Sequence, residues 1–283
     1  MDILVCAKQV PGTSKVDIDE ETGVLKRTGA DAKMNPYDLY ALEAALRLKE
    51  RRGGTVSVIT MGPPQAAEIV REAYATGVDR GILLTDKAFA GSDVLATSRA
   101  LSGGINKTGP YDLIICGKQT TDGDTAQIGP ELAEFLGIPH VTNVTEILET
   151  DEDETARDGE WNKKIRVSAD MGDYSEICDI EFPCLITVEK EIYTPRLPSY
   201  LKARETDEKE IEILALADLS DADPNGYGLD GSPTRVEKIF PPEPKNERIT
   251  LEGTNGELAD KIYVLLAGMK FVYPKQGASL PNG

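Results

Sequence analysis

The feature that most constrains the fold of this chain is the regular alternation of short apolar runs and amphipathic segments along its first 140 residues. The apolar runs at 2–8, 55–61, 81–85 and 111–117 are predicted to be strands. Segments with helical periodicity lie between them and after them. Strands that are apolar on both faces and alternate with helices form a parallel sheet covered on both sides. The sequence therefore predicts an α/β fold with a doubly wound, mostly parallel sheet.

The pattern changes after residue 140. Strands are predicted at 141–149 and 164–172, on either side of an acidic turn at 151–160 that is typical of a solvated hairpin tip. Residues 177–191 are predicted to form a further strand pair or a strand that enters the sheet.

After residue 190 the chain becomes irregular and rich in Pro, Gly, Asp and Asn, with one predicted helix at 257–269. An irregular segment of this length is unusual inside a compact domain. Scattered apolar residues favour docking on another protein over disorder: Tyr227, Leu229, Val236, Ile239 and Phe240. We therefore predict an α/β domain at 1–190 and an arm at 191–283 that embraces another protein.

Charge excludes several classes of partner. The chain has 49 acidic and 31 basic side chains and a net charge of −18. Phosphate backbones and anionic lipid would repel such a chain, so we expect neither nucleic acid nor a membrane as a partner. No apolar run approaches the length needed to cross a bilayer, and the N-terminus lacks the features of a signal peptide. We therefore expect a cytoplasmic protein.

Cysteine and histidine usage excludes several kinds of site. The four cysteines lack metal-binding spacing, and His140 is the single histidine. Histidine triads and multi-histidine metal sites are therefore excluded, and no metal site or catalytic side chain is predicted. Redox chemistry on this chain would have to be carried by a bound cofactor.

One glycine-rich motif matches the dinucleotide-binding fingerprint in its letters but not in its sequence context. Residues 226–231 (GYGLDG) match G-x-G-x-x-G, but they follow an acidic loop and precede Pro233 without a helical stripe. The dinucleotide fingerprint must follow a strand and open a helix, so we do not assign a pyrophosphate site here.

The informative segment is 117–130 (GKQTTDGDTAQIGP), between a buried strand and a helix. Doubly wound sheets bind ligands at this edge, and a helix start offers free N–H donors to a phosphate. Gly123 and Ala126 would let the backbone approach a ligand, and the threonines add neutral donors. Asp124 and Gln127 also have the spacing of a capping box. Capping without a ligand and nucleotide binding therefore both remain open for this loop.

Other predicted strand ends and helix starts at the same edge carry polar side chains. Each also has a simpler explanation: Asn35 as an N-cap, Met61 as a core residue and Asp93 as a first-turn acid. Because several such groups converge on one edge, we expect a ligand crevice there.

The sequence at this point resembles the β subunit of electron transfer flavoproteins. The resemblance rests on VCAKQVP near the N-terminus, on MNPYDLYALEAALRLKE, on GKQTTDGDTAQIGPELAEFLGIP, on TVEKEIYTPRLPSYLKA and on GLDGSPTRVEKIF, in this order over nearly the whole chain. It implies an α/β domain of the adenine-nucleotide hydrolase type. It also implies a partner α subunit, which holds an FAD and is wrapped by the arm.

The resemblance further implies a nucleotide between the N-terminal strand, the Asn-Pro pair, Met61 and the loop after the fourth strand. Residues of that loop are expected around the pyrophosphate and the ribityl chain of the cofactor. The regions of Ala7, Asn35 and Met61 are expected at its adenosine end. Asp93 and Thr97 are expected at its flavin end. The full expected set is Ala7, Lys8, Asn35, Pro36, Tyr37, Asp38, Met61, Asp93, Thr97, Gly117, Lys118, Gln119, Thr120, Thr121, Asp122, Gly123, Asp124, Thr125, Ala126, Gln127, Ile128 and Gly129.

The family divides by the nucleotide it holds. Members of the mitochondrial type hold AMP, whereas electron-bifurcating members hold a second FAD and have a loop similar to TDGDTAQIGP. The resemblance therefore implies an FAD that accepts hydride from NADH and passes electrons to ferredoxin and to the FAD of the α subunit. The FAD of the α subunit would in turn serve a flavin dehydrogenase of the acyl-CoA or 2-hydroxy acid type. The alternatives are an AMP-holding β subunit and, outside the family, a stand-alone adenine-nucleotide-binding regulatory domain.

Overall fold

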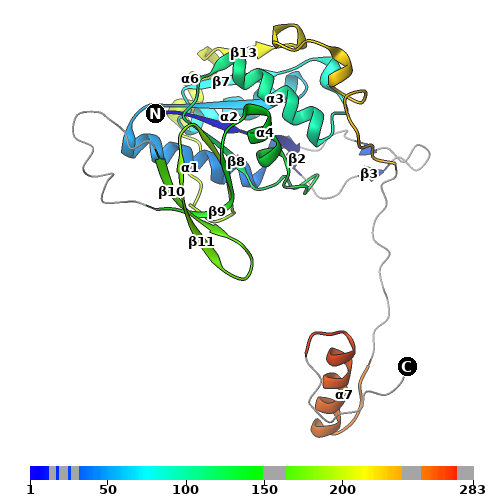
Figure 1. Ribbon diagram of the computed structural model, residues 1–283. Coiled ribbons are helices and arrows are strands. Elements are labelled where there is room, and N and C mark those ends of the chain that lie inside the picture. Colours follow the sequence, from blue (N-terminus) through cyan, green and yellow to red (C-terminus); the bar gives the residue numbers. More distant parts are fainter. Residues whose placement is uncertain (13–16, 19–24, 27–31, 149–163, 238–249, 273–283) are drawn as a thin grey trace. The chain divides into compact units, whose positions relative to one another are not determined.

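A computed structural model describes residues 1–12, 17–18, 25–26, 32–148, 164–237 and 250–272 (Figure 1). The acidic turn predicted at 151–160 lies outside these residues, as do Ile239 and Phe240. The chain divides into two units, Met1–Lys238 and Ile239–Gly283. The first holds the sheet and the second the helix α7 (Asn255–Gly268).

The predicted alternation of strands and helices is confirmed in the first unit. In chain order its N-terminal elements are β1 (Asp2–Cys6), β2 (Gln9–Pro11), β3 (Asp17–Ile18), β4 (Leu25–Lys26), β5 (Ala32–Met34), α1 (Pro36–Arg52), β6 (Thr55–Met61), α2 (Ala67–Thr76), β7 (Arg80–Leu84), α3 (Val94–Thr108), β8 (Leu113–Gly117) and α4 (Ile128–Leu136). The later elements are β9 (His140–Leu148), β10 (Lys164–Asp170), β11 (Ser175–Glu181), β12 (Cys184–Val188), α6 (Tyr200–Glu205) and β13 (Ile211–Leu214).

The sheet is nine-stranded, with the order β11-β10-β9-β12-β8-β1-β6-β7-β13. All pairs from β9 to β13 in this order are parallel, and β10 and β11 add an antiparallel hairpin at one edge. The mostly parallel, doubly wound sheet predicted from the sequence is therefore confirmed. Every residue of β12 is buried, as expected for a strand that enters the sheet between two others.

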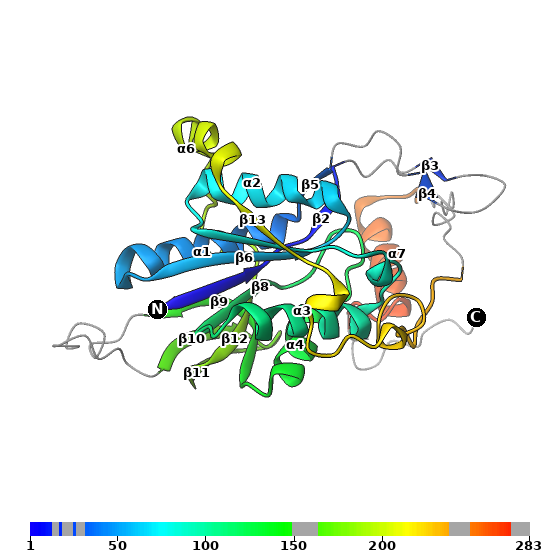
Figure 2. The same cartoon turned by 90° about the horizontal axis from the view of Figure 1, so that it is seen from above.

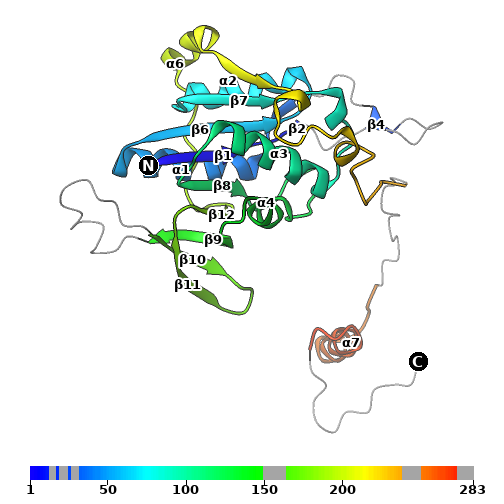
Figure 3. The same ribbon diagram turned by 45° about the horizontal axis from the view of Figure 1, so that its top comes forward.

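Helices cover both faces of the sheet. Figures 2 and 3 show α1 and α2 on one face and α3 and α4 on the other. The two faces carry separate apolar clusters. Leu42 and Ile69 belong to the first cluster, and Ala100 and Leu132 to the second. This two-sided core fixes the strands of the sheet, so that the loops at its carboxyl edge start from rigid positions.

Two elements beyond residue 190 were not predicted. The short helix α6 packs against α2, and β13 pairs with β7 as the last strand of the sheet. The division between the two units therefore falls later in the chain than the predicted boundary at 190. β13 has only four residues and lies in a charged segment, so its sequence lacks the long apolar run that identified the inner strands.

The glycine-rich motif at 226–231 forms a compact turn against α3. Tyr227 is buried with its ring edge-on to Phe89, and the guanidinium of Arg99 lies over the same ring. Gly228 has φ +59° and lies so close to the carbonyl oxygen of Ala88 that a side chain would not fit. These contacts account for the glycines without a nucleotide, as the sequence context indicated.

Candidate functional site

The candidate site lies at the carboxyl edge of the sheet. Strands β8, β1 and β6 are neighbours and parallel, and Cys6 is in register with both Ile59 and Cys116. The residues that follow these strands therefore come together, as the sequence predicted. They include Ala7, whose N–H donates to the carbonyl of Ile59 at 2.9 Å, and Met61, which packs half-buried on the second apolar cluster.

Asn35 joins this edge to the loop that follows β8. Asn35 is the N-cap residue of α1, as the sequence indicated, but its side chain is fully buried and makes no capping hydrogen bond. Its Nδ2 instead donates to the carbonyl of Gln119 at 2.9 Å, and its Oδ1 accepts from the N–H of Thr121 at 3.2 Å. An amide can do this because it offers a donor and an acceptor together.

Asp38 belongs to the first turn of α1 and lies next to Gly117, where the same loop begins. Its carboxylate is only 5% exposed and accepts from the N–H of Lys8 at 2.8 Å. Burial raises the pKa of Asp38 to about 7, although hydrogen bonds from Lys8, Asn35 and Gly117 oppose the shift. A side chain at Gly117 would come within 2.5 Å of Asp38 Oδ1, so glycine is required where β8 ends.

The outer side of the loop is held by an ion pair. Lys8 Nζ lies 2.8 Å from Asp122 Oδ2, and both side chains are partly exposed. The pKa of Asp122 is lowered because hydrogen bonds and charge from Lys8 outweigh the opposing effect of partial burial. Its main partner is thus a lysine from the segment that follows β1.

The loop carries two non-glycine residues in the left-handed region, Asp124 (φ +55°) and Ala126 (φ +56°). Such residues cost about 1–3 kcal/mol each and cluster at ligand sites. Backbone of this kind can turn successive N–H groups toward an anion. The N–H groups of Thr125 and Ala126 donate to no other group in the described part of the chain. These groups point to a place where a phosphate could bind.

The capping-box interpretation of this loop is wrong. Gln127 is the N-cap of α4 but makes no side-chain capping bond. The Asp124 carboxylate accepts from the side chain of Gln119, within the loop. Of the two alternatives left open by the sequence, simple capping therefore has no support in the hydrogen bonds.

Glycines at the loop have different roles. A Cβ at Gly123 would meet only Thr120 Oγ1, at 3.5 Å, which is an ordinary contact. Glycine is therefore not needed at 123 for the fold, and the space beside it is open to a ligand. A Cβ at Gly129, by contrast, would collide with the side chain of Thr187 on β12, so this glycine serves the packing of α4.

The predicted flavin end lies at the start of α3. Asp93 is the N-cap of this helix, with Oδ1 accepting from Ala96 N–H at 3.1 Å. Its Oδ2 accepts from both the N–H and the hydroxyl of Thr234, at 3.0 and 2.7 Å. Thr97 lies one turn further on and is half-buried. The carboxylate of Asp93 is therefore occupied within the chain, which sequence spacing did not indicate.

Sequence reasoning missed two carboxylates at this edge. Glu131 on α4 has a buried Oε2 that finds no hydrogen-bond partner among the described residues, and the pKa of Glu131 is raised by burial and by the nearby charge of Asp93. Glu189 follows β12 and pairs with Lys118. Glu131 resembles an ordinary first-turn acid in the sequence, and no local signal reveals its burial.

The remaining predicted residues lie at the same edge: Pro36, Tyr37, Thr120 and Ile128. The carbonyl of Thr120 accepts from the N–H of Asp124 at 2.9 Å, and Ile128 packs on the second apolar cluster. Cys6 and Cys116 are buried free thiols, as expected from their apolar runs. In the described residues no cluster of His, Cys, Asp or Glu could hold a metal ion. Within the same residues, no helix has the length and apolar character to span a bilayer.

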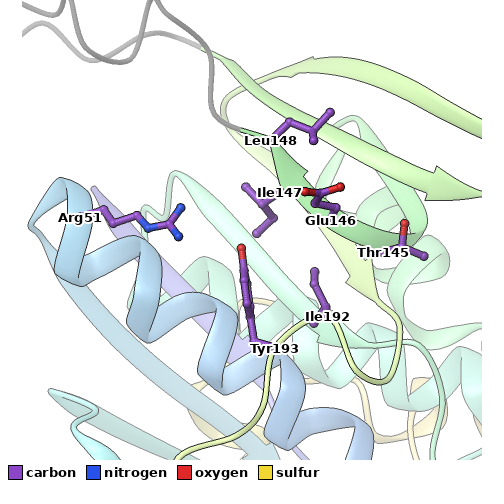
Figure 4. A pocket seen from close by; sticks show the side chains of 7 residues that line it. All are labelled: Arg51, Thr145, Glu146, Ile147, Leu148, Ile192 and Tyr193. Carbon is purple, nitrogen blue, oxygen red and sulfur yellow. The ribbon is translucent and has the colours of Figure 1, made fainter.

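A cavity of about 550 Å³ lies elsewhere (Figure 4). Its lining residues are Arg51, Thr145, Glu146, Ile147, Leu148, Ile192 and Tyr193. None of them belongs to the predicted site, and they come from the end of α1, from β9 and from the segment after β12. The loop after β8 does not line this cavity.

Known proteins resemble this chain over most of its length. The model of the electron transfer flavoprotein domain matches residues 22–219. The electron transfer flavoprotein subunit beta of Clostridium acetobutylicum is 44% identical over 261 residues, which cover 92% of this chain and 93% of that protein. Subunit CarD of the caffeyl-CoA reductase-Etf complex of Acetobacterium woodii is 42% identical, with 93% and 98% coverage. Protein FixA of Azorhizobium caulinodans is 38% identical, with 89% and 88% coverage.

Proposed function

The chain belongs to the electron transfer flavoprotein β-subunit family, and on this premise we propose that it binds FAD at the carboxyl edge of its sheet within a heterodimer with an α subunit. The observation that carries the proposal is the loop after β8. The N–H groups of Thr125 and Ala126 in this loop have no acceptor among the described residues, the space beside Gly123 is open, and Asn35 and Lys8 hold the loop.

The residues fit a nucleotide diphosphate group. Two left-handed residues and the start of α4 place backbone donors together, where an anion is favoured. The whole expected set from Ala7 to Gly129 is proposed to surround the cofactor, with Thr121, Asp122, Gly123, Thr125 and Gln127 nearest the pyrophosphate. Because the Asp93 carboxylate is already bonded to Thr234, we place Asp93 as support for the flavin end rather than as a direct hydrogen-bond partner.

We propose FAD rather than AMP because the loop sequence TDGDTAQIGP resembles that of electron-bifurcating members. When bound, the flavin would supply the hydride and electron chemistry, from NADH toward ferredoxin and toward the FAD of the α subunit. The chain itself would bind and orient it. CarD is named as part of a caffeyl-CoA reductase complex, and by analogy we propose that this pair serves a flavin dehydrogenase of the acyl-CoA or 2-hydroxy acid type.

The cofactor content of the purified pair tests this proposal. We expect two FAD and no AMP per α/β pair after gentle purification, measured by absorbance and by chromatography of the released nucleotides. One FAD and one AMP would instead identify a non-bifurcating pair. A pair with no nucleotide in this chain would remove the proposed site altogether.

The second unit supports the proposed α-subunit contact. Helix α7 has only 14 residues, and three of its large apolar side chains are exposed: Ile262, Val264 and Leu266. Isolated helices of this length are marginal in water and are normally stabilised by packing. We therefore propose that the arm after the sheet, with α7, docks on the α subunit. The same feature argues against a stand-alone regulatory domain.

A substitution in α7 tests the arm. We expect Ile262→Asp to weaken the α/β pair at least tenfold, because a buried isoleucine contributes about 1.5–3 kcal/mol. The dissociation constant of the pair is the measurement, and Asp260→Ala on the same helix is the control. An unchanged dissociation constant for Ile262→Asp would exclude α7 from the interface.

A further inference from the structure

The chain is firmly attached to the start of α3 shortly before the second unit begins. After β13 it returns to this helix, where Tyr227 is buried against Phe89 and the N–H of Gly228 donates to Ser92 Oγ at 3.1 Å. Ser232 is also buried, and its hydroxyl donates to the carbonyl of Gly228 at 2.6 Å. This glycine-rich segment is therefore a packed part of the sheet domain.

Asp93, the N-cap of α3, makes the next attachment. Its N–H donates to Ser232 Oγ at 2.8 Å, and its Oδ2 accepts from the N–H and the hydroxyl of Thr234 at 3.0 and 2.7 Å. Its other oxygen, Oδ1, caps α3 by accepting from the N–H of Ala96. Burial opposes ionisation, but the hydrogen bonds from Thr234 and from the helix lower the pKa of Asp93 below its ordinary value. An ionised carboxylate therefore holds Thr234, and hydrogen bonds of this kind are the strong ones.

The attachment ends directly after this point. The guanidinium of Arg235 still donates to the carbonyl of Leu229, at 3.4 Å. Val236 is 80% exposed, and within the described part of the chain neither Val236 nor Glu237 makes a hydrogen bond. The first unit ends at residue 238. The carboxylate of Asp93 is thus the last strong attachment of the chain before the second unit.

We propose that Asp93 is a positioning residue for the arm, which fixes the point where the arm leaves the sheet domain. Helix α3 follows the parallel strand β7, so this point lies at the carboxyl edge of the sheet, on the side of the proposed cofactor site. A chain released from Asp93 would leave the domain from further back, near Gly228, and α7 would hang on a longer tether. The anchor therefore limits how far the α subunit held by α7 can move from that edge. This inference rests on the proposed function for the identity of the partner.

Asp93→Asn separates the anchor from the helix cap. The asparagine keeps an oxygen that accepts from the N–H of Ala96, and Asn and Asp are equally good N-caps. Its amide group, however, presents N–H donors where Thr234 also presents one, so the bond to the backbone of Thr234 is lost.

Asp86→Asn is the matched control. Asp86 follows β7 and has the same arrangement, with Oδ1 accepting from the N–H of Ala88 at 3.0 Å and Oδ2 from the N–H of Leu216 at 3.1 Å. The substitution therefore breaks an equivalent bond to a later segment of the chain and leaves the anchor at Thr234 intact.

Pulsed electron paramagnetic resonance on the full chain measures the effect. One spin label is attached at Val236→Cys and the other at Lys107→Cys, which is exposed near the end of α3, in a chain with Cys178→Ser because the other native cysteines are buried. With Asp93 present we expect one narrow distance between the labels, and in Asp93→Asn a broad distribution. Asp86→Asn should keep the narrow distance. Thr234→Val, which loses only the hydroxyl bond, should broaden it less than Asp93→Asn.

Hydrogen exchange of the unlabelled chain supplies the second readout. The amide of Thr234 should exchange about tenfold faster in Asp93→Asn than in the wild type and in Asp86→Asn. A distance that stays narrow in both Asp93→Asn and Thr234→Val would overturn the inference, as would equal broadening in Asp86→Asn. If the wild-type chain forms no pair with an α subunit, the proposed function fails, and the label distances in the free chain still decide whether Asp93 anchors the arm.

Discussion

Thr125→Val is expected to bind FAD about ten- to a hundredfold more weakly than the wild-type chain, with an unchanged melting temperature. The substitution preserves shape and removes one hydroxyl. A hydrogen bond to a charged group contributes about 1.5–3 kcal/mol, which corresponds to that loss of affinity. Thr125 is exposed and its hydroxyl makes no hydrogen bond in the described part of the chain, so the fold does not depend on it.

Gly123→Val tests the proposed pyrophosphate site by filling the open space beside residue 123. The backbone at 123 is outside the left-handed region and a Cβ meets only Thr120 Oγ1, so the apo fold should accept a side chain. The branched side chain would occupy the space proposed for the pyrophosphate and should also expel FAD from this chain. Flavin content and melting temperature are measured on the same sample, and the FAD of the α subunit serves as the internal reference.

Gly117→Ala is the informative contrast. A methyl group at 117 would come within 2.5 Å of Asp38 Oδ1 and 2.7 Å of the Tyr37 carbonyl carbon. This variant should therefore lose stability as well as cofactor. If Thr125→Val and Gly123→Val both retain two flavins and normal NADH oxidation, the cofactor lies elsewhere on the chain.

The second large effect concerns the pH dependence of stability. The pKa of Asp38 is about 7 in the folded chain, against an ordinary value of 3.8. The folded state therefore binds this proton more tightly than the unfolded state does. The free energy of unfolding should fall as pH rises from about 4 to about 7, because the buried carboxyl must ionise in place. Between pH 5 and pH 8 this group alone accounts for about 2.5 kcal/mol.

Asp38→Asn should remove that part of the pH dependence. An asparagine keeps an acceptor for the N–H of Lys8 and cannot ionise. Urea unfolding of the cofactor-free chain at pH 5 and pH 8 measures the difference. Glu134→Gln, which changes an exposed carboxyl on α4, is the control and should retain the wild-type dependence. If Asp38→Asn and the wild type lose the same free energy between the two pH values, Asp38 is already ionised at pH 5.

The sequence predicted the inner strands and helices well, because each of them has a local sequence pattern of its own. Strands such as β6 and β8 are continuous apolar runs, and α1 lies between Pro36 and Gly53, with Pro in its first turn and Gly after its last. The strand order and the place of β13 depend on long-range pairing, which no local pattern encodes. β13 is short and lies at an edge, where a strand needs little apolar surface.

Part of the geometry at the carboxyl edge of the sheet followed from the sequence, and part did not. Parallel strands bring their carboxyl ends together, so the meeting of Lys8 and Gly117 followed from the fold class. The partner of each side chain did not. Asn35 at a helix start has the sequence signature of a cap, and only the three-dimensional path of the loop after β8 reveals that its amide is bonded to Gln119 and Thr121.

The position of β12 has a consequence for the biosynthesis of the chain. β12 lies between β8 and β9, although it follows both in sequence, and the sheet gains its last strand only with β13. Until residue 188 has left the ribosome, β8 has an open edge next to the very loop that forms the site. The nascent chain must therefore keep an apolar strand edge unpaired while β9, β10 and β11 are synthesised, which exposes it to aggregation. A fragment that ends before β12 should need a chaperone to stay soluble, and the cofactor can be loaded only late in synthesis.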